Sequence, residues 1–142
     1  MKFLKQFSLL LTALFLFSAF SIDGEKTYVG KWKGKDQGEI GFLTLTEDNY
    51  AIFEFNGQIV GGKSYNSQGV DASMKYTVDT SSEPYKIDFI ILDNSEGEEL
   101  GRLKGIIKMN NRNEMEMAMT FGGGTERPTD FSVDNITFSR YK

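Results

Sequence analysis

The chain has 142 residues, with 16 basic and 20 acidic side chains, a formal net charge of −4, and neither cysteine nor histidine. These absences exclude a Ser-His-Asp triad, a thiol nucleophile, disulfide bonds, and zinc or haem sites that depend on Cys or His ligands. The 39% of hydrophobic residues and 25% of charged residues are typical of one ordinary globular domain.

The N-terminus has the organisation of a secretory signal peptide. Lys2 and Lys5 precede the apolar run 7–20, and Ala19 and Ser21 are small residues at the positions that a signal peptidase reads. A retained membrane anchor is the alternative, but a spanning helix needs about 20 apolar residues. The run is shorter than that and contains hydroxyl groups, so cleavage after Ser21 is the preferred interpretation.

Residues 1–21 are therefore expected to be removed, which leaves residues 22–142 as one exported domain, periplasmic or secreted, without a membrane-spanning segment. Removal takes away Lys2 and Lys5 and no acidic residue, so 14 basic residues remain against 20 acidic ones and the net charge becomes −6. Phosphate backbones repel such a domain, and neither nucleic acid nor an anionic membrane surface is expected as a partner.

The rest of the chain alternates short apolar runs with clusters of Gly, Asn, Asp and Ser, a pattern that predicts consecutive β-strands and almost no helix. The Asn56-Gly57 pair favours a tight type I′ hairpin turn. The expected strands are 28–33, 41–46, 50–55, 58–63, 72–79, 86–92, 100–109, 114–121 and 135–141.

These strands predict an all-β fold, an antiparallel up-and-down β-barrel of eight or nine strands. A single open sheet would leave two exposed edges and an uncovered apolar face, whereas closure removes both problems. A β-sandwich is the alternative, but it suits the hairpin-short connections less well.

Alternation along the strand 114–121 places Met115, Met117, Met119 and Phe121 on one face, and Tyr76 belongs to the apolar face of its own strand. Thioethers adapt to irregular apolar ligands as readily as they fill gaps in a core. The methionines are therefore interpreted either as core filling or as the lining of a ligand cavity.

The segment 57–64 matches the P-loop pattern G-x-x-x-x-G-K-[ST]. A working P-loop needs a helix that opens at its Lys-Ser pair, and the residues that follow here do not start one. The acidic segment 93–99 lacks the ligand spacing of a calcium loop and is expected to be a solvated turn. No metal ion and no cofactor are expected.

Gly30 and Trp32, on the first expected strand, are similar to the G-x-W signature of the lipocalins, in which a tryptophan plugs the closed end of the barrel. Lipocalins also place a basic residue near the C-terminus over that tryptophan, and Arg140 is positioned to do so by stacking and cation–π attraction. The resemblance implies a structural role for these three residues.

A broader resemblance covers the segments 84–89 and 103–107 and the run of Arg127, Pro128 and Phe131. It resembles a lipocalin-like β-barrel family of uncharacterised function, found in exported bacterial proteins and abundant in planctomycetes. The resemblance implies a fold without an established activity. Phe131 is expected to tuck under the barrel end while Arg127 bonds loop carbonyls.

The glycine-rich connection 122–129 is interpreted either as a lid over the barrel mouth or as a simple crossing to the last strand, with Arg127 paired to a surface carboxylate.

The leading hypothesis is an exported, non-enzymatic barrel that binds a small apolar or amphipathic molecule, since closed barrels of this size can hold one ligand. No catalytic residue is identified, because no arrangement of carboxylates, Lys or Tyr points to acid–base chemistry. The alternative is a filled barrel that acts as a structural or protein-interaction module of the cell envelope through an apolar face at Ile90 and Leu92. The candidate ligand-lining residues are Tyr76, Met115, Met117, Met119 and Phe121.

Overall fold

The computed structural model of this chain describes residues 26–35, 40–120, 126–132 and 134–142. The expected signal peptide and Phe121 lie outside the described residues. The described part contains nine strands: β1 (Gly30–Gly34), β2 (Ile40–Leu45), β3 (Ala51–Phe55), β4 (Gln58–Ser67), β5 (Val70–Asp79), β6 (Tyr85–Asp93), β7 (Glu99–Asn111), β8 (Glu114–Met119) and β9 (Asn135–Arg140).

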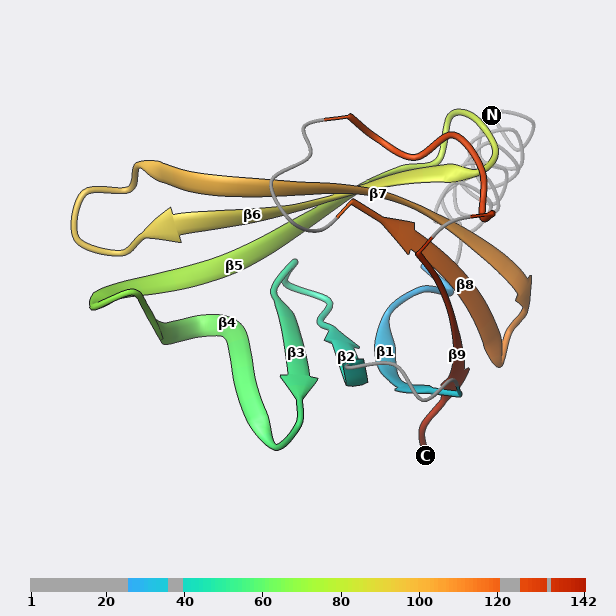
Figure 1. Cartoon of the computed structure of the whole chain (residues 1–142), viewed down its shortest axis with the longest axis horizontal. Coiled ribbons are helices and arrows are strands. Elements are labelled where there is room, and N and C mark those ends of the chain that lie inside the picture. The colour runs from blue at the N-terminus through green and yellow to red at the C-terminus, as the bar shows by residue number, and fades with distance from the viewer. Residues whose placement is uncertain (1–25, 36–39, 121–125, 133) are drawn as a thin grey trace, which may run out of the picture.

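The strands form one closed antiparallel barrel in which every strand pairs with its neighbour in the chain and β9 pairs with β1 (Figure 1). This confirms the predicted all-β up-and-down barrel and excludes the β-sandwich. The described residues include no helix long and apolar enough to cross a membrane.

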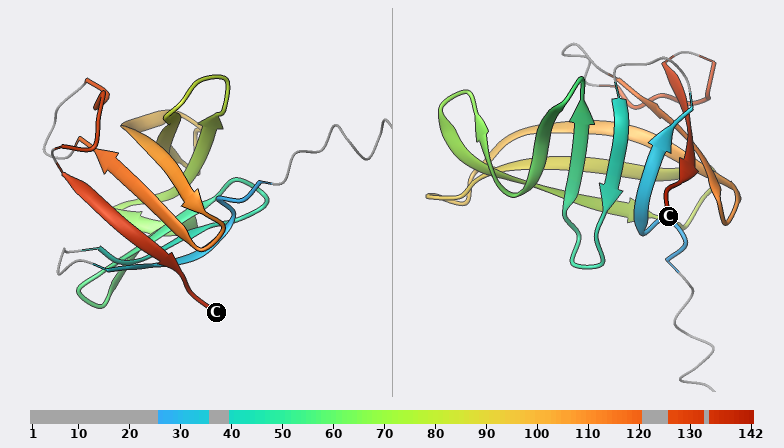
Figure 2. Two further views of the ribbon diagram at one scale, coloured as in Figure 1. Left: turned by 90° about the vertical axis from the view of Figure 1, so that its right-hand side faces the viewer. Right: turned by 90° about the horizontal axis from the view of Figure 1, so that it is seen from below.

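The strands differ greatly in length. β1, β2 and β3 have 5, 6 and 5 residues, whereas β5, β6 and β7 have 10, 9 and 13. Figure 2 shows the short strands lying across the long ones, which extend beyond them on one side. All nine predicted strands are present, and the largest error is at β4, which continues to Ser67 rather than ending at residue 63.

β4 is long because two glycines let it change partners. It pairs with β3 as far as Gly61 and with β5 from Gly62 onward. Gly61 and Gly62 have φ values of 117° and 83°, and a Cβ on Gly61 would collide with the carbonyl oxygen of Ala51. Positive φ and a close backbone approach are what glycine permits, so this pair makes a corner of the barrel. The P-loop-like pattern is therefore a bent strand with no helix after it.

The hairpin turn between β3 and β4 is the predicted one, since Asn56 and Gly57 have φ values of 47° and 83°. Gln68 and Gly69 form a second turn of the same kind between β4 and β5, with φ values of 50° and 87°.

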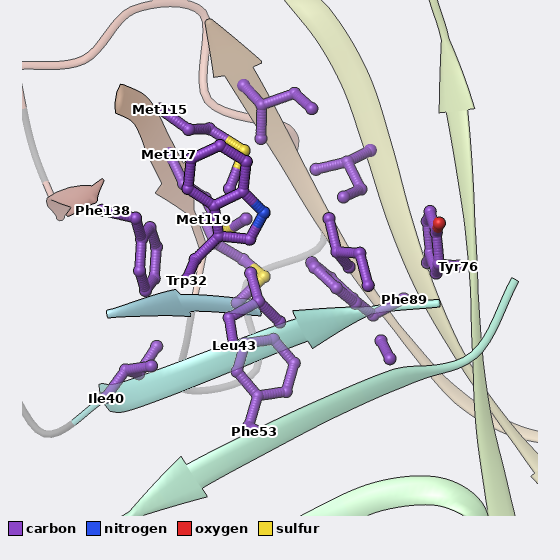
Figure 3. Close-up of a cluster of buried hydrophobic side chains, with 14 of the residues drawn as sticks. Trp32, Ile40, Leu43, Phe53, Tyr76, Phe89, Met115, Met117, Met119 and Phe138 are labelled. Atoms are coloured by element: carbon purple, nitrogen blue, oxygen red, sulfur yellow. The ribbon is translucent and has the colours of Figure 1, made fainter. Parts of the chain in front are cut away.

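The core lies inside the barrel, on the faces that alternation assigns to the interior. Figure 3 shows Trp32 beside the three methionines of β8, with Phe138 and Leu43 around them. The buried cluster consists of Trp32, Ile40, Leu43, Leu45, Ala51, Phe53, Met74, Tyr76, Ile87, Phe89, Ile107, Met115, Met117, Met119 and Phe138.

Candidate functional site

One end of the barrel, where β1 begins and β9 ends, is plugged by Trp32. Its indole is completely buried, and its ring N–H donates a hydrogen bond of 2.9 Å to the carbonyl oxygen of Tyr28. The guanidinium carbon of Arg140 lies 4.4 Å from the centroid of the tryptophan ring. The contact expected from the sequence is present, and we call this the closed end.

Arg140 also ties three chain segments together. Its guanidinium donates hydrogen bonds of 2.6, 3.0 and 2.9 Å to the carbonyl oxygens of Thr27, Val29 and Arg112. These carbonyls come from the start of the described chain and from the β7–β8 turn. One cation thus satisfies three backbone acceptors while its face covers Trp32, a combination that a planar guanidinium can provide and an ammonium cannot.

Gly30 makes room for this arrangement. Its φ is 140°, a conformation that side-chain-bearing residues avoid, and a Cβ there would lie 2.6 Å from the Nη1 atom of Arg140. The glycine of the Gly-x-Trp pattern therefore has a physical reason in this chain, because the arginine occupies the space that a side chain would need.

The middle of the barrel is filled. Met115, Met117 and Met119 are 0%, 0% and 1% exposed, and Tyr76 is 2% exposed. The phenol of Tyr76 donates a hydrogen bond of 2.6 Å to the carbonyl oxygen of Thr46. Burial, reinforced by the neighbouring Tyr28 and Asp48, raises the pKa of Tyr76 to about 12, so the phenol stays protonated. Its polar group already has a protein partner.

The opposite end of the barrel contains a pocket of about 310 Å³, which we call the mouth pocket. It opens among the interior faces of β3 to β8, at the ends of β3 and β4 that lie away from the closed end. Its lining residues are Phe53, Phe55, Val60, Tyr65, Asn66, Ser67, Met74, Ile91, Leu103 and Met119.

The mouth pocket is apolar, with a small neutral polar rim. None of the described residues that line it carries a charge. Phe53 stacks on Phe55 with ring centroids 5.6 Å apart, which makes an aromatic wall. Burial raises the pKa of Tyr65, so its hydroxyl is neutral at physiological pH. Apolar walls with a few neutral hydrogen-bonding groups suit an uncharged organic molecule.

The predicted ligand-lining residues divide between the mouth pocket and the packed core. Met119 lines the mouth pocket, whereas Tyr76, Met115 and Met117 lie in the packed core and are not among its lining residues. Phe121 lies outside the described residues. Of the two interpretations of these methionines, core filling describes Met115 and Met117.

Several mouth residues were missed from the sequence. Ile91 and Leu103 occupy the inward-facing alternate positions of their strands and could have been found by alternation. Tyr65 could not have been found in this way. Val60 and Tyr65 both line the pocket, although regular alternation would place two residues five positions apart on opposite faces. The corner at Gly61 and Gly62 and a register shift after it reverse the alternation within β4.

Arg127 anchors the connection 126–132 to the outside of the barrel. Its Nη1 donates to the carbonyl oxygens of Ile87 and Gly105 at 3.1 and 2.9 Å. Its Nη2 lies 2.7 Å from Oδ1 of Asp88, a carboxylate that also pairs with Arg102 at 2.9 Å. The expectation of loop carbonyls is corrected here, since both acceptors belong to strands β6 and β7. The expected carboxylate pair is present.

Pro128 follows in the same connection and is half-buried, as is Phe131. Phe131 lines a second pocket together with Pro84 and Tyr85. Figure 1 shows this connection running over β7. Within residues 126–132 the segment is held to the barrel wall by Arg127 and covers β6 and β7 on the outside.

Comparison with protein-family models, with curated proteins and with solved structures found no match. The described residues contain no group of three or more carboxylates placed to hold a metal ion. The function is therefore inferred from the sequence and from the geometry of the described residues.

Proposed function

We propose that this protein is an exported, non-enzymatic, lipocalin-like barrel whose mouth pocket holds a small uncharged apolar or amphipathic molecule. The observation that supports it best is the contrast along the barrel axis, since the interior is solidly packed around Trp32 yet leaves about 310 Å³ open at the mouth. That volume falls at the lower end of the range for small-molecule pockets.

The lining selects the class of ligand. Burying an unpaired charge against phenylalanine, methionine and leucine side chains has a desolvation cost that exceeds the favourable binding free energy from contacts with the apolar walls. An uncharged body fits the walls, and one polar group can reach Tyr65, Asn66 or Ser67 at the rim. A sequence without His or Cys and a pocket lining without charged groups support a ligand carrier rather than an enzyme.

Native and denaturing mass spectrometry of the protein purified from its own producing cells tests this proposal. We expect a reproducible excess mass under native conditions that is lost on denaturation, which also identifies the molecule. A native mass equal to that of the bare chain from residue 22 would support export but count against a carrier.

A matched pair of variants locates the ligand. Leu103→Trp places an indole in the mouth pocket, so we expect it to abolish the excess mass without loss of the fold. Leu100→Trp lies three residues earlier on β7, where the side chain is 47% exposed and does not line the pocket, and it should retain the ligand. Equal retention in both variants would place the molecule elsewhere.

An envelope interaction module is the second candidate. Ile90 and Leu92 are half-buried on the outward face of β6, and Ile59 is 66% exposed at the start of β4. Ile90→Asp should then leave a folded protein that no longer recovers its partner in pull-downs from envelope extracts. An unchanged pull-down would remove this candidate.

A further inference from the structure

A second pocket lies where the connection 126–132 meets β6 and β7, and it reaches the core, since Ile107 belongs to the buried cluster and Tyr85 and Met109 pack against it. Its volume is about 410 Å³, and it is bounded by the residues before and at the start of β6, the end of β7 and the connection 126–132. We call it the side pocket. It shares no residue with the mouth pocket, and its lining consists of Glu83, Pro84, Tyr85, Ile107, Lys108, Met109, Thr129, Asp130 and Phe131.

The connection, which forms one wall of the pocket, is anchored to the barrel. Upstream of Thr129, Arg127 is bonded to two strand carbonyls and to Asp88. The hydroxyl of Thr120 donates to the carbonyl oxygen of Glu126 at 2.7 Å. On the other side of Phe131, the backbone N–H of Ser132 donates to Asp130 at 3.0 Å. A wall that Arg127 anchors to the barrel and a local turn stiffens costs little ordering entropy when a ligand binds.

The lining joins an apolar bed to an excess of negative charge. Pro84, Tyr85, Ile107, Met109 and Phe131 supply apolar and aromatic surface. Thr129, two carboxylates and one ammonium complete it, so the charged residues sum to −1. The two rings offer faces to which a cation is attracted.

We propose that the side pocket binds a small organic cation with an apolar body, such as an aromatic amine. The apolar body lies against Pro84 and Phe131, and the ammonium group pairs with Glu83 and Asp130. An organic anion of the same shape is disfavoured, because the carboxylates outnumber Lys108 and the protein as a whole is acidic.

Two probes of equal shape and opposite charge test the proposal, phenethylamine and 3-phenylpropionate. We expect titration calorimetry to show saturable binding of phenethylamine and much weaker binding of 3-phenylpropionate. Ligand-observed saturation transfer should show contact through the phenyl ring. No saturable binding of the amine, or equal binding of the two probes, would overturn the proposal.

Three variants assign the binding to this pocket. The double variant Glu83→Gln, Asp130→Asn removes both charges, and the new amide oxygen at position 130 can still accept the Ser132 hydrogen bond. We expect its Kd for phenethylamine to rise about fivefold, since each exposed charge pair contributes only modestly to binding.

Lys108→Gln removes the opposing cation and should lower the Kd about threefold, a gain that misfolding cannot produce. Leu103→Trp, which fills the mouth pocket, should leave amine binding unchanged. If Leu103→Trp abolishes it, the amine binds in the mouth pocket, and if the charge variants leave the Kd unchanged, the side pocket is not its site. The proposal of a ligand in the mouth pocket and the proposal of an amine in the side pocket can therefore be refuted independently.

Discussion

The two ends of the barrel are built from the same alternating strands but are packed in opposite ways. At the closed end Trp32 is completely buried under Arg140, and at the mouth Phe55, Val60 and Leu103 are only half-buried around an open pocket. Alternation says which side chains face inward, but not whether enough side chains meet there to fill the space.

Strand length accounts for the difference. β5, β6 and β7 extend past the short strands β1, β2 and β3 on the side of the mouth (Figures 1 and 2). Interior side chains at the ends of the long strands therefore have fewer partners across the barrel. Loss of packing partners leaves a cavity where walls are rigid, and the corner at Gly61 and Gly62 keeps β4 curved around it.

The largest expected effect comes from truncating an aromatic residue at each end. Trp32→Ala should lower the free energy of unfolding by about 4 kcal/mol, since it removes a fully buried indole together with its cation–π partner. Phe55→Ala at the mouth should cost about 1 kcal/mol because that ring is half-buried beside empty space. Urea unfolding followed by circular dichroism measures both, and equal losses would mean that the two ends are packed alike.

A smaller effect isolates the guanidinium at the closed end. Arg140→Lys keeps the positive charge but cannot reach three carbonyls in different directions, so a loss of about 2 kcal/mol is expected. Arg102→Lys is the control, because Arg102 forms ion pairs with Asp88 and Glu99 on a side chain that is 37% exposed. Exposed pairs contribute little, and this control should change stability by less than about 0.5 kcal/mol. A control loss as large as that of Arg140→Lys would show a general cost of replacing arginine by lysine, and the three carbonyl bonds of Arg140 would not explain its effect.

How much of this could be foreseen from the sequence depends on whether the cause is local. The nine strands, the turn at Asn56 and Gly57 and the contact of Arg140 with Trp32 follow from alternation, turn chemistry and a resembling motif. The position of the pocket does not, because it results from unequal strand lengths and from a corner that reverses the parity of β4. For the same reason Met115 and Met117 looked equivalent to Met119, although only Met119 reaches the mouth pocket.

The anchoring of Arg127 was also beyond local patterns. The sequence suggested a carboxylate partner, but the carbonyl oxygens of Ile87 and Gly105 are brought together only by the pairing of β6 with β7. A long-range strand register cannot be read from the residues on either side of a loop.

The smallest effect concerns Tyr76, whose phenol donates to the carbonyl oxygen of Thr46 near the closed end. Tyr76→Phe should cost about 1 kcal/mol at pH 7 through the lost hydrogen bond. The folded-state pKa of Tyr76 is raised from 10.0 to about 12, so folding favours the neutral phenol. Its stabilising contribution is complete below pH 10 and is lost as the pH rises from 10 toward 12.

Wild-type protein should therefore lose more stability between pH 10 and pH 12 than the Tyr76→Phe variant does, in urea titrations at constant ionic strength. Tyr141→Phe is the matched control, since that ring is 49% exposed and should leave the pH profile unchanged. Parallel profiles for wild type and Tyr76→Phe would mean that the phenol exchanges its proton as freely as a surface tyrosine. The closed end would then be open to water, and the contrast with the mouth would no longer hold.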